Sequence, residues 1–193
     1  VDPVQTNHLR LSRTADGTLL AYGQRDQNQE TAKGRKRLAC TATLCRSADH
    51  GKTWSEPEVV PLEVPGPYEI SNPMVVTSDG RWLAPTATFH NGRYGERVVL
   101  QESSDNGSTW PHMHTVFQDP GSGIGYLEQK IIEFHSNHLL AIAWVQDYQA
   151  DTDLKNEYSL SIDGGRTWNG PHPTGIQGQT MTPIWLGEDR FLV

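Results

Sequence analysis

One eight-residue pattern, S-x-D-x-G-x-T-W, occurs three times in the chain and constrains the fold more than any other feature. The copies occupy residues 47–54, 103–110 and 161–168, and their aspartates lie 56 and then 58 residues apart. A near-even period of this length, with turn residues inside it, is typical of repeat architectures. We therefore expect a chain built from successive copies of one supersecondary unit.

The chemistry of the pattern predicts a tight turn that leads into a strand. An aspartate in a turn accepts hydrogen bonds from backbone N–H groups a few residues on. The glycine supplies a positive φ at low cost, and the tryptophan can bury a large apolar area. Asp49, Asp105 and Asp163 are therefore expected to bind the backbone of their own turns and to stabilise the fold.

Each period is predicted to contain four short strands, with the repeated turn between the third and fourth. In the second period the strands are expected at 72–77, 81–88, 97–103 and 112–117, and in the first at 9–13, 18–23 and 38–45. These runs are rich in β-branched and aromatic residues and are bounded by Gly, Asp and Asn. Four antiparallel strands per period predict an all-β fold, a β-propeller of four-stranded blades. We expect one domain, residues 1–193, with blades at about 5–62, 68–118 and 126–174 and the start of a further blade at 179–193.

Charge and composition argue against nucleic acid as a general partner and against a membrane span. The net charge of −7 argues against general nucleic-acid binding, and the sequence contains no apolar run long enough to span a membrane. The basic run 33–37 is interpreted as a solvated loop rather than a phosphate-binding patch. Cys40 and Cys45 lie five residues apart in a predicted strand, so they should face opposite sides and not bridge. The histidines show no metal-ligand spacing, and no metal or cofactor is predicted.

Propeller geometry brings equivalent positions of different blades together at one mouth, the default place for a ligand. The starts of the innermost strands contribute one group, and the loops between second and third strands contribute another. Carboxylates, arginine, amides and histidine at one mouth suit carbohydrate hydroxyls and acid/base work at a glycosidic bond. The candidate site residues are Glu128 and Asp26 for catalysis, and Arg25, Asn7, Asn72, Gln129, His90, Tyr148 and Gln179 for substrate binding.

The repeated pattern resembles the Asp box, or BNR repeat, of the sialidase-type β-propellers, and the resemblance extends over the whole chain. It implies a six-bladed propeller, a carbohydrate ligand, glycoside hydrolase activity on a terminal sugar, and a secreted or periplasmic location. Residues 126–133 are similar to the segment whose Glu activates the family's tyrosine nucleophile, which puts Glu128 in that role. Arg25 stands where the family has an arginine, and Asp26 follows it as a candidate acid/base carboxylate.

The sequence departs from the family at two arginines that clamp the sialic acid carboxylate. Asn7, His8 and Leu9 stand where the first arginine is expected, and residues 155–158 lack the second. A bidentate arginine fork is the physical requirement for such a clamp. Three readings therefore stay open: a divergent glycoside hydrolase, a non-catalytic propeller that binds a glycan or protein, and a scaffold. The site hypothesis predicts that Glu128 and Arg25 face one shared cavity.

Overall fold

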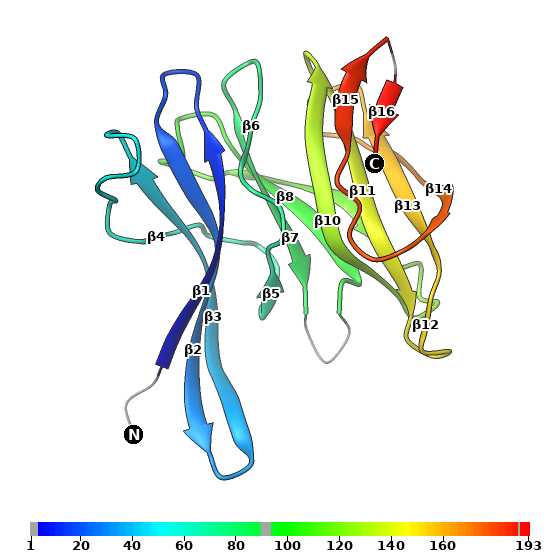
Figure 1. The fold of residues 1–193 in the computed structure, drawn as a ribbon, viewed down its shortest axis with the longest axis horizontal. Helices are drawn as coiled ribbons and strands as arrows, with labels where there is room; N and C mark the ends of the chain where they lie inside the picture. Colours follow the sequence, from blue (N-terminus) through cyan, green and yellow to red (C-terminus); the bar gives the residue numbers. More distant parts are fainter. Residues whose placement is uncertain (1–3, 90–93, 189) are drawn as a thin grey trace.

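The computed structural model describes residues 4–89, 94–188 and 190–193, and the described chain folds as antiparallel β-sheets (Figure 1). Sheet 1 has the strand order β1-β2-β3-β4, and a hairpin of β15 and β16 follows sheet 3. Sheet 2 has the order β5-β7-β8-β9, with β6 also paired to β7, and sheet 3 has the order β10-β11-β13-β14, with β12 also paired to β11. The strands are β1 Val4–Arg13, β2 Leu19–Thr31, β3 Gly34–Ser47, β4 Glu58–Val59, β5 Tyr68–Glu69, β6 Val75–Val76, β7 Trp82–Thr88, β8 Arg97–Ser103, β9 His112–Gln118, β10 Ile124–His135, β11 His138–Asp147, β12 Thr152–Asp153, β13 Lys155–Ser161, β14 Asn169–Gln177, β15 Ile184–Gly187 and β16 Arg190–Leu192.

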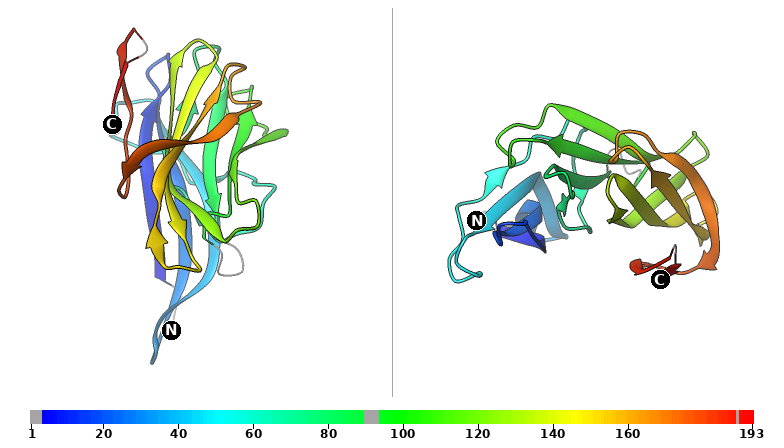
Figure 2. Two further views of the ribbon diagram at one scale, coloured as in Figure 1. Left: turned by 90° about the vertical axis from the view of Figure 1, so that its right-hand side faces the viewer. Right: turned by 90° about the horizontal axis from the view of Figure 1, so that it is seen from above.

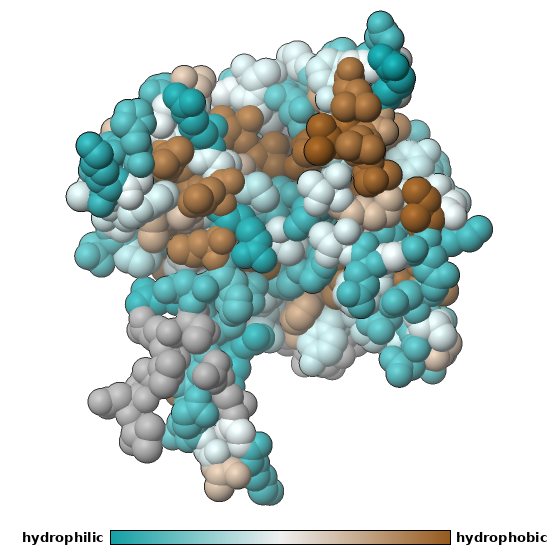
Figure 3. All heavy atoms as spheres, in the orientation of Figure 1, coloured by the Kyte–Doolittle hydropathy of each residue, from teal (hydrophilic) through white to brown (hydrophobic). Residues whose placement is uncertain are grey.

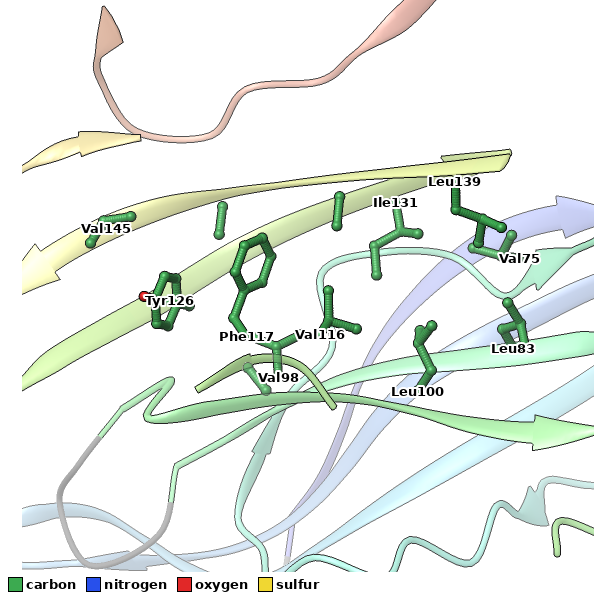
Figure 4. Close-up of a cluster of buried hydrophobic side chains, with 13 residues drawn as sticks. Val75, Leu83, Val98, Leu100, Val116, Phe117, Tyr126, Ile131, Leu139 and Val145 are labelled. Carbon is green, nitrogen blue, oxygen red and sulfur yellow. The ribbon is translucent and has the colours of Figure 1, made fainter. Parts of the chain in front are cut away.

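The sheets lie side by side along an arc, as the view from above in Figure 2 shows. Within each sheet the chain meanders outward from its first strand, so all first strands begin at the same end of the molecule. Two hydrophobic cores fill the spaces between neighbouring sheets. One lies between sheets 1 and 2 and includes Leu20, Leu44 and Trp110. The other lies between sheets 2 and 3 and includes Leu83 and Leu139 (Figure 4).

The first strand of sheet 2 differs from the continuous strand predicted at 72–77. It is split into β5 and β6, and both pieces pair with β7. Pro73 lies between the two pieces and has no N–H to donate to a ladder, so pairing cannot run through it. The Asn72 Nδ2 donates to the carbonyl of Pro73 at 2.9 Å, which satisfies the interrupted backbone locally.

The three repeated turns have nearly identical hydrogen bonds, and the prediction for their aspartates is confirmed. Asp49, Asp105 and Asp163 each accept the backbone N–H of the threonine four residues on, at 2.9, 2.8 and 2.9 Å. Each aspartate also accepts hydrogen bonds from the hydroxyl of that threonine and from the hydroxyl of the serine two residues before the aspartate. These turns follow β3, β8 and β13, so they lie at the end of the sheets opposite to the starts of β5 and β10.

The hydrogen bonds in these turns hold the aspartates ionised. Bonds from Thr53 and Ser47 lower the pKa of Asp49 to about 2, and bonds from Thr109 and Ser103 do the same for Asp105. Burial would raise the pKa of Asp163, but the bonds from Thr167, Ser161 and Arg166 bring it to about 2 as well. A carboxylate that accepts several N–H and O–H groups is stabilised in its charged form.

The tryptophans of the second and third repeated turns pack against the preceding sheet. Trp110 of sheet 2 lies in the core shared with sheet 1, and Trp168 of sheet 3 packs against the core shared with sheet 2. Trp54 belongs to sheet 1, which has no preceding sheet among the described residues, and it is 40% exposed. Trp54 is therefore less covered than Trp110, which is 8% exposed.

One arginine in sheet 1 and one before the second strand of sheet 2 each contact the repeated turn of the following sheet. Arg46 donates to the carbonyl of Asn106 at 3.2 Å and lies over the Trp82 ring at 5.3 Å. Arg81 donates to the carbonyl of Gly164 at 2.9 Å and forms ion pairs with Asp79 and Glu102. Neighbouring sheets are therefore joined by polar contacts as well as by their apolar cores.

Sheet 1 contains the largest departure from the sequence prediction. Strands were expected at 18–23 and 38–45 with a solvated loop between them. Instead, β2 continues to Thr31 and β3 begins already at Gly34, and the two strands pair as one long hairpin. Arg25 and Asp26 therefore lie in a strand and not in a loop. The basic run 33–37 forms the turn and the start of β3. Cys40 and Cys45 are free thiols, as predicted.

Candidate functional site

The candidate site lies where the first strands of sheets 2 and 3 begin and run side by side. Four hydrogen bonds join them, each between residues 59 positions apart, and the longest runs from Asn72 Nδ2 to the carbonyl of Ile131 at 3.5 Å. The backbone N–H of Glu128 donates to Glu69 Oε2 at 3.1 Å, Lys130 Nζ donates to the carbonyl of Ser71 at 2.5 Å, and the N–H of Ile131 donates to Asn72 Oδ1 at 3.0 Å. The repeat thus brings equivalent strand positions of neighbouring sheets into contact.

A β-bulge shapes the strand at Glu128. The register between β10 and β11 shifts between Leu127 and Lys130, so Glu128 and Gln129 have no direct partner in the ladder. Glu128 has a φ of 46°, a left-handed conformation that is costly for a residue with a side chain. Bulges re-aim side chains near active sites, and strained backbone is concentrated there. The fold therefore accepts a local cost to present Glu128 as it does.

Glu69 is the second carboxyl group at this place, beside Glu128, and its pKa is raised. We call Glu69, Glu128, Lys130 and the aromatic residues beside them the cluster. Burial raises the pKa of Glu69, and the charge of Glu128 raises it further, whereas the Glu128 N–H and the Lys130 charge lower it. Burial also lowers the pKa of the Lys130 ammonium, helped by the positive charge of Arg10 on β1. Carboxyl groups with raised pKa values in such settings can hold a proton for general acid catalysis.

An aromatic group lies next to these carboxylates. The Tyr148 hydroxyl donates to the carbonyl of Tyr94 at 2.7 Å, and the two rings meet edge to face at 6.2 Å. Phe89 lies 4.6 Å from Tyr94, whose side chain is 45% exposed. Burial raises the pKa of Tyr148 to about 12, and the charge of Glu69 contributes to the increase. Exposed aromatic rings beside carboxyl groups can provide an apolar face for a sugar ring.

Two glycines allow sheets 2 and 3 to approach closely at this point. The N–H of Tyr126 donates to the carbonyl of Gly95 at 2.8 Å. A Cβ at Gly95 would collide with the backbone of Tyr126, and a Cβ at Gly125 would collide with Tyr94 and Tyr148. The absence of side chains at these two positions lets the segment before β8 contact the start of β10.

The predicted residues divide between this cluster and other places. Glu128 and Tyr148 belong to the cluster. Asn72 is buried and binds the backbone of β10. Gln129 is fully buried, and its amide has no hydrogen-bond partner among the described residues. His90 lies outside the described residues.

The other predicted residues lie farther out in the fold. Asn7 is exposed on β1 opposite Arg25 in the β1–β2 ladder. Asp26 is buried in β2 and paired with Arg37 at 3.2 Å, and its expected position in a loop at the mouth is wrong. Gln179 is exposed after β14, and its carbonyl accepts the Asn156 Nδ2 at 3.5 Å.

Glu69, Lys130 and Tyr94 were not predicted from the sequence. One signal could have found Glu69, because it is an acidic residue at the start of the first strand of its repeat, close to the position equivalent to Glu128. Within the described residues, no group of three or more His, Cys, Asp or Glu side chains could hold a metal. No helix in the described part of the chain is long and apolar enough to cross a membrane.

Two hollows lie away from this cluster. One, of about 930 Å³, opens near the repeated turns and is lined by Arg13, Arg46 and Glu133 among others. The other, of about 350 Å³, is apolar and lies between sheet 3 and the β15–β16 hairpin, where Leu140, Ile142 and Phe191 line it. Figure 3 shows hydrophobic side chains gathered over β15 and β16. The predicted cavity shared by Glu128 and Arg25 stays a prediction.

Meandering four-stranded antiparallel sheets with Asp-box turns define an all-β protein of the sialidase type. Residues 4–180 match the BNR repeat-like domain, and the chain belongs to that family. No curated protein matches the sequence. A crystal structure of a protein of unknown function from Dyadobacter fermentans is similar at 22% identity and a TM-score of 0.74, with 95% of this chain and 54% of that one covered.

Enzymes with the same fold are also similar in structure. The NanB sialidase of Streptococcus pneumoniae has 16% identity and a TM-score of 0.55, with 91% of this chain and 26% of that one covered. An α-L-arabinanase of Penicillium chrysogenum, solved with arabinobiose, has 21% identity and a TM-score of 0.55, with 88% and 50% covered. At these identities the likeness establishes the fold alone. The chain spans about half the length of the first of these relatives.

Proposed function

We propose that this protein is a glycoside hydrolase that acts on a terminal sugar, with Glu69 and Glu128 as its pair of catalytic carboxyl groups. The observation that carries the proposal is the contact between Glu69 Oε2 and the N–H of Glu128 at a strained bulge. Hydrolysis of a glycosidic bond commonly requires two carboxyl groups in different protonation states. Asp26, already paired with Arg37, is a weaker candidate for the second group.

The environments of the two carboxyl groups suggest their roles. The raised pKa of Glu69 suits a general acid that donates its proton to the leaving glycosidic oxygen. Glu128 then acts as the carboxylate that activates water or attacks the sugar carbon, according to the separation of the two groups around the substrate. Tyr94 and Tyr148 provide an apolar surface for the sugar ring. Arg25, Asn7, Asn72, Gln129, His90 and Gln179 remain candidates for substrate binding.

The relatives and the missing clamp support a proposal for the substrate class. The solved relatives include sialidases and an arabinanase, so both acidic and neutral terminal sugars are represented among proteins of this fold. The sequence lacks arginines at two positions of the sialic acid clamp, which favours a terminal sugar without a carboxylate. We propose a secreted or periplasmic location on the family resemblance.

We also propose that the three sheets are blades of a six-bladed propeller, with the β15–β16 hairpin opening the fourth. Exposed Trp54 on one side and the apolar hollow beside Leu140 on the other both favour further sheets packed at these faces. Such sheets would cover apolar surface of the kind that soluble proteins seldom leave open. They would also contribute further residues to the mouth.

A binding propeller without catalysis is the second candidate. The hydrogen bond between Glu69 and the Glu128 N–H also connects two sheets, which a purely structural brace would do equally well. A glycan-binding protein would use the same aromatic surface and the same hydroxyl-binding groups. The two functions differ in turnover, and this difference is directly measurable.

The test is turnover on a panel of aryl α-L-arabinofuranosides, aryl sialosides and other aryl glycosides. Glu69→Gln and Glu128→Gln should each lower kcat by about 10²–10⁴-fold, because an amide keeps the shape but cannot transfer the proton. Glu188→Gln, at an exposed carboxylate on the opposite end, should have no effect. Glu69→Gln should also remove the loss of activity at high pH that the ionisation of Glu69 causes. Unchanged turnover in both site variants, with glycan binding retained, would establish the binding propeller instead.

A further inference from the structure

The long β2–β3 hairpin projects from the end of the molecule where the first strands begin (Figure 1). We call residues 27–38 the arm. Its strands stay paired up to Thr31 and Gly34, and Ala32 and Lys33 make the turn between them. Nearly all side chains described on the arm are exposed, and most of them are hydrophilic (Figure 3).

The arm concentrates positive charge in an acidic protein. Residues 33–37 contain four of the 16 lysines and arginines, whereas the whole chain carries a net charge of −7. Asp26 neutralises Arg37 at the base of the arm, and Glu30 is the one acidic residue on it. Lys33 and Lys36 are exposed. A basic projection on an acidic body attracts anions to one place and repels them elsewhere.

The remaining side chains of the arm favour sugar over nucleobase or membrane. Gln27 and Gln29 are exposed and offer amide groups, which bind sugar hydroxyls. Residues 27–38 contain no aromatic side chain, so the arm has no stacking platform for bases. It also lacks the apolar face of a membrane-binding amphipathic element.

The base of the arm is fixed to the candidate site. The N–H of Tyr68 donates to Cys40 Sγ at 3.4 Å, and the N–H of Ile70 donates to Gln24 Oε1 at 2.9 Å. Both contacts flank Glu69 directly. The base of the arm is therefore joined to the strand that carries one of the proposed catalytic carboxyl groups, and a polymer bound along the arm can extend from its tip toward that strand.

We propose that the arm binds an acidic polysaccharide, through the carboxylate or sulfate groups along its chain, and holds it beside the mouth. The inference rests on the proposed function for the chemistry of the mouth. It extends that function, because the negative charge is recognised along the polymer and not on the terminal sugar. The interaction is electrostatic, so it weakens as salt screens the charges.

The test measures binding of the protein to immobilised polygalacturonate and dextran sulfate, which distinguish carboxylate from sulfate, with neutral dextran for comparison. The wild type should bind one or both acidic polymers at low ionic strength and not dextran. Lys33→Glu/Lys36→Glu should weaken that binding by about tenfold or more. The matched control Lys52→Glu/Arg190→Glu makes the same charge change at exposed positions away from the arm, and it should leave binding nearly unchanged.

Three results would overturn the proposal. Equal weakening by both double variants would mean that net charge alone governs binding. Tighter binding of duplex DNA than of either acidic polymer would assign the arm to nucleic acid. Full binding by a folded Lys33→Gln/Lys36→Gln variant, which removes the charges without reversing them, would exclude a role for these lysines.

Failure of the arm and failure of the proposed hydrolase give different results. Glu69→Gln should abolish turnover of a small aryl glycoside and leave polygalacturonate binding intact. Lys33→Glu/Lys36→Glu should weaken polygalacturonate binding and leave turnover of the small aryl glycoside intact. Turnover that survives Glu69→Gln would contradict the catalytic assignment, even where the arm binds as expected.

Discussion

Arg81 offers the sharpest test of how neighbouring sheets are held together. Its side chain is 7% exposed and pairs with Glu102, whose side chain is 6% exposed, at 3.2 Å. It also donates to the carbonyl of Gly164 in the next repeated turn. Arg81→Met keeps most of the apolar stem of the side chain and removes the charge, so it isolates the polar contacts.

The expected cost follows from the burial of Glu102. Breaking a buried ion pair by removing one partner costs about 3–5 kcal/mol, because a charge is left uncompensated. Glu102 keeps His114 Nε2 at 2.8 Å and Arg166 at 3.9 Å, which places the estimate at the lower end of that range. We expect Arg81→Met to lower the free energy of unfolding by about 3 kcal/mol. In a domain of this size that corresponds to about 6–12 °C in the melting temperature.

The assay is urea unfolding, analysed with the slope of the transition as well as its midpoint. Arg81→Met/Glu102→Leu should be less destabilised than the sum of the two single variants by about 1–3 kcal/mol, because neither of the two buried charges is then left without the other. Arg190→Met is the control, since its pair with Glu188 is largely exposed, and it should cost less than about 0.5 kcal/mol. A loss below about 1 kcal/mol for Arg81→Met, or strict additivity in the double variant, would refute the reasoning.

Four further predictions concern other parts of the molecule. The pKa of Asp105 falls from 3.8 to about 2 on folding, so the stability that Asp105 contributes is present above pH 3.8 and is lost as pH falls toward 2. Asp105→Asn should therefore reduce the fall of the melting temperature between pH 3.8 and pH 2, measured in a pH series. Leu139→Ala empties a fully buried site between sheets 2 and 3 and should cost about 3–5 kcal/mol by urea unfolding. Glu128→Gly relieves a positive φ and should be at least as stable as the wild type while losing turnover; a clear loss of stability would contradict the strain at this bulge. Gly95→Ala places a methyl group against the backbone of Tyr126 and should lower the melting temperature, with activity reduced as sheets 2 and 3 are pushed apart.

The sequence predicted the parts of the fold that depend on local chemistry. The three repeated turns, their aspartates and the strands beside them follow from residue types at fixed offsets, and the structure contains them. The arm was missed because residues 24–37 are mostly polar, and polar residues between strands usually indicate a loop. Backbone pairing alone extends that hairpin, and no side-chain periodicity reports it. The split first strand of sheet 2 could have been predicted from Pro73.

The candidate site was only partly accessible from sequence. Glu128 was found because it begins a first strand and matches a family position. Glu69 was missed because its role depends on which strand lies beside it, and the bulge that re-aims Glu128 has no sequence signature. Asp26 has a suitable residue type, but a strand and an ion pair with Arg37 remove it from the expected loop. Contacts between repeats decided these cases, and one repeat alone does not encode them.

The arginine contacts between sheets have a consequence for the order in which the protein can form. Arg46 finds its carbonyl acceptor 60 residues later in the chain, and Arg81 finds its acceptor 83 residues later. As a chain is synthesised from its N-terminus, sheets 1 and 2 therefore each emerge with a guanidinium that has no acceptor in the next repeated turn until the following sheet has been made. Sheet 2 supplies the acceptor for Arg46, and sheet 3 supplies the acceptor for Arg81. Duplication of one whole period would preserve the hydrogen bond between each arginine and the next repeated turn. A duplication that separated an arginine from the following turn would remove it.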